Sequence, residues 1–444
     1  MRVIIVGAGE VGRSIAANLA EGHDVILIER DEDIVEELTY SLDVLLLQGD
    51  GTDLSVLREA GIENADMLIA STDIDETNIV TCGAAKTVSD VFTIARVKRR
   101  DLLSTWKNSR KAFNIDFMVC SDLLTAEAIF RISGIPGAQD VDAFAGGLVR
   151  MAEFGIGGDS PVTGQTVSEA DRYSSLTFAA IFRGDEVVIP RGNTVLEPGD
   201  RVVVIGSPDS IGDFAMDTVR DEDSSTESVV IVGGGELGFQ TARLFEEHGY
   251  RPKLIEQNEG RARELAEALP NTTVLQSDAT NTEFLAHEDI DRADVVVAAL
   301  ESDEKNLLVS LLADRIGVDR TIAVVNAVEY ADLFETVGVD TAVNPREKTA
   351  EEIIRFTRHN RTEKIAILEH DLAEVLEIEI SRDSVLANRR IVDAVGDLPD
   401  SVVIGAISRS GELVTPRGET EIRVGDHVVV FAETAVLDKL TDKI

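Results

Sequence analysis

The opening residues of the chain combine apolar runs with a helical pattern. Residues 3–6 are an uninterrupted run of β-branched apolar side chains, which is typical of a strand buried on both faces. Val11, Ile15 and Leu19 then recur at helical spacing, and residues 24–28 predict a second strand. Strand, helix and strand in this order form the repeating unit of a parallel sheet, so we expect an α/β fold.

Three glycines stand between the first predicted strand and the helix. Gly7, Gly9 and Gly12 have the spacing G-x-G-x-x-G, and Glu29 ends the second strand 20 residues after Gly9. In dinucleotide-binding folds these glycines allow a tight turn, backbone approach to the pyrophosphate and close helix packing. The helix N-terminus attracts phosphate, and a carboxylate at Glu29 can accept hydrogen bonds from a ribose. Because that carboxylate would repel a 2′-phosphate, the pattern favours NAD over NADP.

The pattern continues with further strands that alternate with helical segments. They are expected at residues 43–48, 65–70, 92–97 and 117–120. Thr72 and Asp73 follow one of these strands, and Arg96 lies near the end of the next. Ligands of open α/β sheets bind outside the carboxyl ends of the strands, so these three residues are candidates to line a nucleotide site. The position of Arg96 in the pattern is equally compatible with a solvated side chain at a strand edge.

The whole arrangement occurs twice along the chain. A second glycine-rich turn begins at Gly233, 226 residues after Gly7, and Glu256 stands where Glu29 would align. The phrase PRG…GD at residues 190–200 recurs at 416–426, with the same offset of 226. Periodic self-similarity of this kind indicates a tandem duplication.

We therefore predict two Rossmann-like domains with doubly wound parallel sheets, each followed by a small α+β domain. The short strands and the Pro and Gly turns of the small domains support that class. A polar, acidic and serine-rich segment between the halves has the composition of a linker. The predicted bounds are 1–135 and 228–358 for the Rossmann domains, 138–218 and 362–444 for the small domains, and 219–227 for the linker.

The two halves differ where a nucleotide would bind. Val324 stands in the second half where Arg96 would align, and Leu-Glu at 300–301 stands where Thr-Asp at 72–73 would align. The second site thus lacks one cation and one hydroxyl group. We expect it to be a weaker site, a site for a different nucleotide, or no site at all.

The chain is strongly acidic along its whole length. Its 82 Asp and Glu against 42 Lys and Arg give a formal net charge of −40 at pH 7. This charge opposes compaction in ordinary salt, but at about 1 M salt the screening length is only about 3 Å, so we expect a halophile's cytoplasm. It also argues against nucleic acid and anionic lipid as partners. No stretch approaches the roughly 20 apolar residues that span a bilayer, and the chain opens on a core strand, so we expect a cytoplasmic protein without membrane insertion.

The sequence offers no catalytic set to accompany the nucleotide folds. Cys82 and Cys120 form no metal pattern and are expected to be reduced, buried thiols. None of the six histidines stands at a predicted strand end that faces the cleft. A dehydrogenase needs a proton donor or acceptor beside the nicotinamide. A nucleotide sensor is therefore favoured over an NAD-dependent oxidoreductase, which stays as the alternative.

Taken together, these motifs resemble the TrkA family, the peripheral nucleotide-binding subunits of Trk potassium-uptake systems, built from paired regulator-of-potassium-conductance (RCK) units. The resemblance covers essentially the whole chain and also includes the duplicated PRG…GD phrase. Its other motifs are VGAGEVG at 6–12, QGDGT at 48–52, REAGIENADMLIASTDIDETN at 58–78 and IAR at 94–96. It implies binding of NAD(H), with ATP or ADP as further ligands. It also implies a homo-oligomeric ring of Rossmann domains docked beneath a separate membrane subunit that translocates potassium.

The resemblance also assigns residues to the sites. In the first half the family pattern matches Gly7, Ala8, Gly9, Glu10 and Val11 for the pyrophosphate, Glu29 for the ribose, and Thr72, Asp73 and Arg96. In the second half it matches Gly233, Gly234, Gly235, Glu236, Leu237 and Glu256. It implies a regulator of potassium uptake that lies at the inner face of the cell membrane through its protein partner. Regulation of a different potassium channel or exporter is the further alternative.

Overall fold

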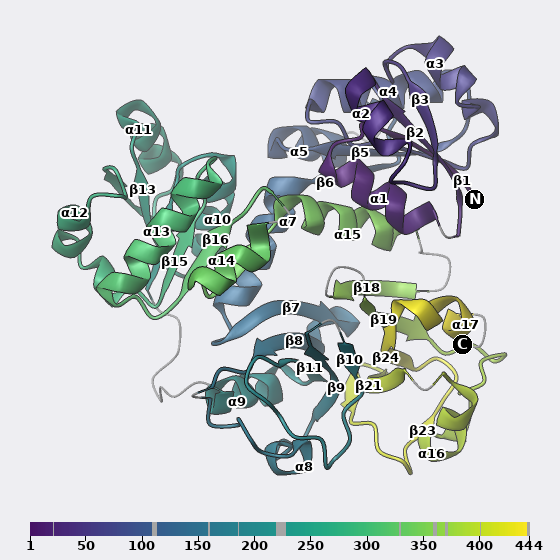
Figure 1. The fold of residues 1–444 in the computed structure, drawn as a ribbon, viewed down its shortest axis with the longest axis vertical. Coiled ribbons are helices and arrows are strands. Elements are labelled where there is room, and N and C mark those ends of the chain that lie inside the picture. The colour runs from purple at the N-terminus through teal and green to yellow at the C-terminus, as the bar shows by residue number, and fades with distance from the viewer. Residues whose placement is uncertain are drawn as a thin grey trace. The chain divides into compact units, whose positions relative to one another are not determined.

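The contacts within the chain divide it into two units in the computed structural model (Figure 1). One unit consists of residues 1–129 and 228–356, and the other of residues 130–227 and 357–444. No helix among the described residues is both long and apolar enough to cross a membrane. The predicted linker at 219–227 lies outside the described residues. The structure describes all residues except 21, 109–112, 159, 185, 219–227, 328–329, 358–361, 369–371, 400 and 442–444.

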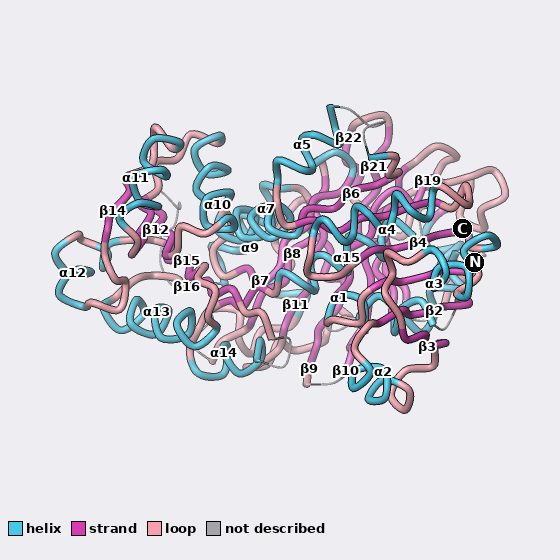
Figure 2. Tube along the Cα trace, turned by 90° about the horizontal axis from the view of Figure 1, so that it is seen from above, coloured by secondary structure: helices cyan, strands magenta, loops and turns pink. Residues whose placement is uncertain are grey.

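The first unit contains two Rossmann-like domains, one from each half of the chain. Each has a six-stranded parallel sheet, with strand orders β3-β2-β1-β4-β5-β6 and β14-β13-β12-β15-β16-β17. Helices alternate with the strands along each domain, as the colouring of Figure 2 shows. This strand order is that of a dinucleotide-binding doubly wound fold. The predicted parallel sheets and their duplication are confirmed.

The elements of the two Rossmann-like domains correspond one to one. The first domain comprises β1 (Arg2–Val6), α1 (Glu10–Ala20), β2 (Asp24–Glu29), α2 (Glu32–Leu38), β3 (Leu45–Gln48), α3 (Leu54–Glu59), β4 (Met67–Ala70), α4 (Asp75–Lys86), β5 (Phe92–Val97), α5 (Arg100–Asn108), β6 (Phe117–Cys120) and α7 (Ser121–Ser133). The second comprises β12 (Val229–Val232), α10 (Glu236–Glu247), β13 (Lys253–Glu256), α11 (Glu259–Ala268), β14 (Thr273–Gln276), α12 (Thr282–His287), β15 (Val295–Ala298), α13 (Asp303–Ile316), β16 (Thr321–Val324), α14 (Ala331–Val337), β17 (Thr341–Val343) and α15 (Pro345–Thr357).

Sheet position explains the apolar pattern of the strands. β1 pairs with β2 on one side and β4 on the other, and residues 3–6 are at most 3% exposed. β3 lies at the edge of the sheet, where all four of its residues are partly or fully exposed. It begins at Leu45, two residues later than predicted. At the other edge, α7 begins at Ser121, directly after the last residue of β6.

The second unit contains two five-stranded antiparallel sheets, one from each half. Their orders are β10-β9-β11-β8-β7 and β18-β19-β24-β21-β22. The first small domain comprises β7 (Ala138–Phe144), β8 (Val149–Gly155), α8 (Val167–Ala170), β9 (Leu176–Arg183), β10 (Glu186–Val188), β11 (Arg201–Gly206) and α9 (Pro208–Thr218). The second comprises β18 (Thr362–Leu368), β19 (Ala373–Glu379), β20 (Arg389–Arg390), α16 (Ile391–Ala394), β21 (Val402–Arg409), β22 (Glu412–Val414), β23 (Glu421–Ile422), β24 (His427–Glu433) and α17 (Leu437–Thr441).

These two sheets share one hydrophobic core, which the sequence analysis did not foresee. Phe144 and Phe182 of the first small domain and Phe431 of the second belong to the same cluster of buried side chains. A buried polar contact accompanies it, because the N–H of Ala145 donates to Glu377 Oε2 at 2.8 Å. The small domains therefore bury their apolar faces against each other rather than separately.

The duplicated PRG…GD phrase has a structural explanation in the small domains. Asp200 and Asp426, its last residues, are 1% and 2% exposed. Arg183 donates to both carboxylate oxygens of Asp200 at 2.8 Å, and Arg409 pairs with Asp426 at 2.9 and 2.7 Å. Burial works to raise the pKa of Asp426, but its hydrogen bonds, above all that from Arg409, hold the pKa below its ordinary value. Each pair fastens a turn to the strand beside it.

The shared core predicts that a cavity in one small domain loosens both. We expect Phe431→Ala to lower the free energy of unfolding by about 3–5 kcal/mol, because a fully buried aromatic ring is lost. Val424→Ala, at a residue 41% exposed, is the control and should change it by less than about 0.5 kcal/mol. Hydrogen exchange should accelerate in β9 and β11 as well as in β21 and β24. Faster exchange confined to the second small domain would contradict a common core.

Candidate nucleotide-binding sites

The first glycine turn has the geometry that its spacing predicts. Gly7 has a φ of +98°, and a Cβ there would lie 2.9 Å from Thr72 Cγ2. A Cβ on Gly12 would lie 1.8 Å from the carbonyl oxygen of Gly7, so only glycine lets α1 pack this closely on the turn. No neighbouring atom lies within 4 Å of a Cβ built on Gly9. The backbone at Gly9 therefore faces open space, as the approach of a pyrophosphate requires.

Glu29, at the end of β2, holds this turn in place. Its Oε2 accepts a hydrogen bond from the N–H of Ala8 at 2.7 Å, and its Oε1 accepts from the N–H groups of Arg30 and Asp31 at 2.6 and 3.0 Å. Oε1 thereby uses both of its acceptor sites, whereas Oε2 keeps one, which leaves room for a ribose hydroxyl. We call the turn at residues 7–12, Glu29, and the residues at the ends of β4 and β5 (Thr72, Asp73 and Arg96) together the first cradle.

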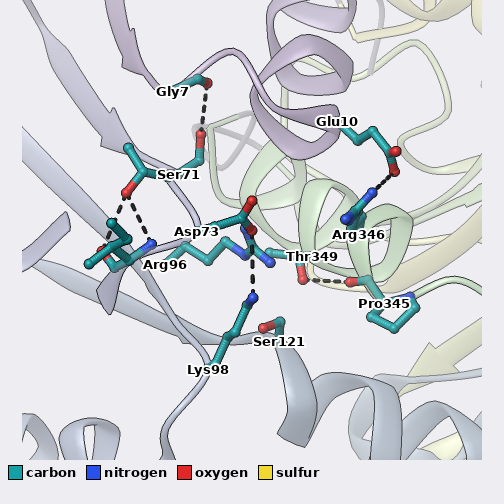
Figure 3. Close-up of polar contacts among 12 residues, drawn as sticks. Gly7, Glu10, Ser71, Asp73, Arg96, Lys98, Ser121, Pro345, Arg346 and Thr349 are labelled. Carbon is teal, nitrogen blue, oxygen red and sulfur yellow. Dashed lines mark hydrogen bonds and ion pairs between the residues drawn. The ribbon is translucent and has the colours of Figure 1, made fainter. Parts of the chain in front are cut away.

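Positive charge gathers around Asp73, just after β4. Arg96 Nη1 lies 3.3 Å from Asp73 Oδ1, and Lys98 Nζ lies 3.6 Å from the same oxygen (Figure 3). Burial alone would raise the pKa of Asp73, but the charges of Arg96, Lys98 and Arg346 outweigh it and hold the pKa below its ordinary value. Of the two interpretations of Arg96, the solvated one is excluded, since the residue is only 5% exposed.

The first cradle fits an anionic nucleotide. Arg96 Nε is buried and has no hydrogen-bond partner among the described residues, so a donor of the cradle is unused. The N-terminus of α1, which begins at Glu10, adds unpaired N–H groups and a partial positive charge. Ala8 and Val11 are at most 2% exposed, so their side chains serve the packing of the turn.

The second half repeats the cradle with the same backbone bonds. Glu256 Oε2 accepts from the N–H of Gly234 at 2.8 Å, and Gly235 has no neighbouring atom within 4 Å of a built Cβ. A Cβ on Gly233, which has a φ of +109°, would lie 2.5 Å from the carbonyl oxygen of Ala299. We call the turn at residues 233–238, Glu256, and the residues that align with Thr72, Asp73 and Arg96 (Leu300, Glu301 and Val324) together the second cradle.

Two asparagines confirm how the halves align. The amide Nδ2 of Asn78 donates to the carbonyl oxygens of residues 72 and 96, each at 2.8 Å, and that of Asn306 donates to those of residues 300 and 324 at 2.9 and 2.7 Å. The second cradle therefore has Leu300 where the first has Thr72, and Val324 where the first has Arg96. The loss of one cation and one hydroxyl group that the sequence predicted is confirmed in space.

The sequence analysis missed the residues that reach each cradle from the other half. Arg346, at the start of α15, forms an ion pair with Glu10 of the first cradle (Figure 3). Asp122, at the start of α7, is close enough to Glu236 of the second cradle for the two charges to interact. Lys98 was also missed. The signal that could have found them is the alignment of residues 122 and 346, which share the offset of the matched Thr-Ala-Glu segments at 125 and 349.

Both cysteines of the chain are in the first Rossmann-like domain. Burial raises the pKa of the Cys82 thiol beyond the physiological range and that of Cys120 to about 12, so neither is a ready nucleophile. No group of three or more metal-ligating side chains occurs in the part of the chain that the structure describes. Both cysteines are buried and free, as predicted.

Comparison with protein families and curated relatives covers nearly the whole chain. Residues 3–113 and 229–345 match the TrkA-N domain, and residues 151–217 and 375–444 match the TrkA-C domain. A Trk system potassium uptake protein TrkA homolog of Archaeoglobus fulgidus is 37% identical over 100% of this chain and 99% of its own length. The TrkA homolog 1 of Methanosarcina mazei is 35% identical over 97% of each chain.

Among solved structures, the chain is similar to a GsuK channel bound to NAD. The TM-score is 0.61 at 18% sequence identity, and the match covers 100% of this chain and 78% of that chain. At this identity the similarity concerns the fold, which is a tandem of RCK-type units.

The acidic environment of Asp122 predicts a pH dependence of stability. Burial, joined by the charge of Glu236, raises the pKa of Asp122 to about 6 from an ordinary value of 3.8. Between these values the folded chain keeps a proton that the unfolded chain has lost, so this residue lowers stability as the pH rises from about 4 to 6. The full cost above pH 6 is about 3 kcal/mol, since one unit of pKa corresponds to about 1.4 kcal/mol.

We expect Asp122→Asn to be more stable than the original chain above pH 6, by up to about 3 kcal/mol, and equal to it near pH 4. Denaturant midpoints of both chains between pH 4 and 8, in the same potassium chloride buffer, measure the difference. All other carboxylates cancel in this comparison. Parallel pH profiles would show that Asp122 has an ordinary pKa.

Proposed function

The chain belongs to the TrkA family of Trk potassium-uptake proteins, and on this basis we propose that it is a nucleotide-binding regulatory subunit of a potassium-uptake system. The single structural observation that carries the nucleotide-binding part of the proposal is the first cradle. Its turn is open at Gly9, and Glu29 stands 20 residues later, as the ribose-binding acid of dinucleotide-binding folds does. The buried Nε of Arg96 has no hydrogen-bond partner among the described residues. In such a protein the ligand is a signal, and it shifts the balance between conformations by its difference in affinity for them.

The proposed ligand of the first cradle is NAD(H), with ATP or ADP as further ligands. The backbone of residues 7–11 would hold the pyrophosphate, and Glu29 would accept hydrogen bonds from the adenosine ribose. Thr72, Asp73 and Arg96 would complete the site. In the second cradle residues 233–237 and Glu256 would play the corresponding roles, with weaker binding because Arg96 has no counterpart there.

The proposed partner is a separate membrane subunit that translocates potassium. The chain would act at the inner face of the cell membrane through that subunit, and several copies would assemble into a ring. The physiology agrees with the charge of −40, because a cell that balances high external salt with internal potassium needs strong potassium import. We also propose that the chain does not transform its nucleotide, since neither buried thiol is a ready nucleophile.

Gly9 and Gly235 have open space at their Cβ positions, so replacing them by alanine tests ligand binding without disturbing the fold. We expect Gly9→Ala to weaken NAD binding at the first cradle at least about tenfold, because the methyl group would occupy the space of the pyrophosphate. Gly235→Ala is the matched variant of the second cradle and should leave the stronger binding event unchanged. Calorimetric titration of the full chain with NAD, NADH, ATP and ADP in multimolar potassium chloride measures both.

Two results would overturn the proposal. One is unaltered binding of every nucleotide to a Gly9→Ala, Gly235→Ala double variant, which would place the ligand elsewhere. The other is oxidation of NADH by the purified chain with any small substrate, which would favour the oxidoreductase alternative. Thermal melts that match the original chain show that the variants are folded.

A further inference from the structure

The last helix of the second Rossmann-like domain, α15, places a positively charged side chain at the cradle of the first domain. Arg346 is the second residue of α15, and its guanidinium forms an ion pair with Glu10, the residue that follows Gly9 in the first cradle. Phe356, near the other end of α15, stacks on Phe92 and Phe117 of the first domain, with ring centroids 5.3 and 4.1 Å apart. α15 therefore contacts the first domain near both of its ends, although it belongs to the second half of the chain.

Arg346 stands between two parts of the first cradle. Its Nη1 also donates to the carbonyl oxygen of Asn326 at 3.1 Å, which fixes the side chain to its own half. Its charge acts on Asp73 as well as on Glu10. Arg346 and Glu10 are both partly exposed, with 30% and 35% of their side chains accessible. Together with Arg96 and Lys98, Arg346 brings a third cation to this cradle.

The aligned position in the other half carries the opposite charge. Asp122 is the second residue of α7, and its carboxylate interacts with the charges of Glu236, which corresponds to Glu10, and of Lys98 and Arg96. Glu236 accepts a hydrogen bond from Gln240 Nε2 at 2.5 Å, and Gln240 in turn accepts from Arg100 Nη1 at 3.0 Å. Among the described residues Glu236 forms no direct ion pair with an arginine. The second cradle also has Val324 and Asn326 at the positions of Arg96 and Lys98. All three cations of the first cradle are therefore replaced by neutral or acidic side chains.

We infer that Arg346, which belongs to the second half, sets whether the first cradle accepts the pyrophosphate of a nucleotide. Arg346 exchanges its pairing with Glu10 for a charge-assisted hydrogen bond to the phosphate, and it thereby couples occupancy of the first cradle to α15. This inference rests on the proposed function, because it concerns the specificity of the same cradle.

The first test removes and restores the charge at residue 346. We expect Arg346→Ala to weaken NAD binding at the first cradle about tenfold, and Arg346→Lys to recover part of the loss, because the charge returns without the planar donor pair. Arg263→Ala is the matched control, since this arginine is on α11 with 75% of its side chain exposed and only a distant pairing at 3.8 Å. Calorimetry of the full chain in potassium chloride measures each constant.

A second variant separates a ligand-binding role from a structural one. Glu10→Gln frees Arg346 from its counter-ion and removes a negative charge near the phosphates, so we expect tighter NAD binding, by about threefold or more. If Arg346 served only to fasten α15 to the first domain, Glu10→Gln would tighten NAD binding equally with and without Arg346, because only the loss of the negative charge would matter. The same gain in an Arg346→Ala background, or no gain at all, would overturn the inference.

If Gly9→Ala abolishes binding while Arg346→Ala leaves it intact, the inference fails and the proposed function stands. If neither changes binding, the proposed function fails too.

Discussion

Each Rossmann-like domain depends on one hydrogen bond between a carboxylate and its glycine turn. Glu29 accepts the N–H of Ala8, and Glu256 accepts that of Gly234. The bond joins the end of the second strand to the turn that begins the first helix, so the two sides of the cradle are fixed before any ligand arrives. A ligand that enters such a preorganised turn does not have to order it, and less of the binding free energy is lost in doing so. The same carboxylate therefore serves the fold and the recognition of a sugar.

On this common scaffold the two halves have diverged in charge rather than in shape. The strand order, the glycine conformations and the bonds of Asn78 and Asn306 are repeated. What changes is the set of side chains that would meet a phosphate. In the second half, Val324 stands at the position of Arg96 and Asn326 at the position of Lys98. Asp122, at the start of α7, stands at the position that corresponds to Arg346 at the start of α15. Substituting side chains at a fixed backbone is the simplest way to give two similar pockets different ligands.

Most of the fold could be predicted from the sequence, because its determinants are local. The runs of apolar residues, the glycine spacing and the acid about 20 residues later define each Rossmann-like half without knowledge of the other. The partners of these elements could not be predicted. A half-buried strand pattern in the small domains says that a face is covered but not by what, so the common core around Phe431 was missed. For the same reason Arg346 was not placed beside Glu10, since only the crossing of α15 between domains brings them together.

The common core of the small domains bears on why the halves are joined in one polypeptide. A protein with a single half would leave this apolar surface bare and would have to cover it with an identical molecule, and a twofold axis would then force both faces to be the same. Covalent fusion supplies the second half at high effective concentration and removes that symmetry requirement. Mutations can then accumulate on one side only. The two repeats of the fused chain can therefore differ in sequence, whereas the subunits of a symmetric dimer of single units cannot.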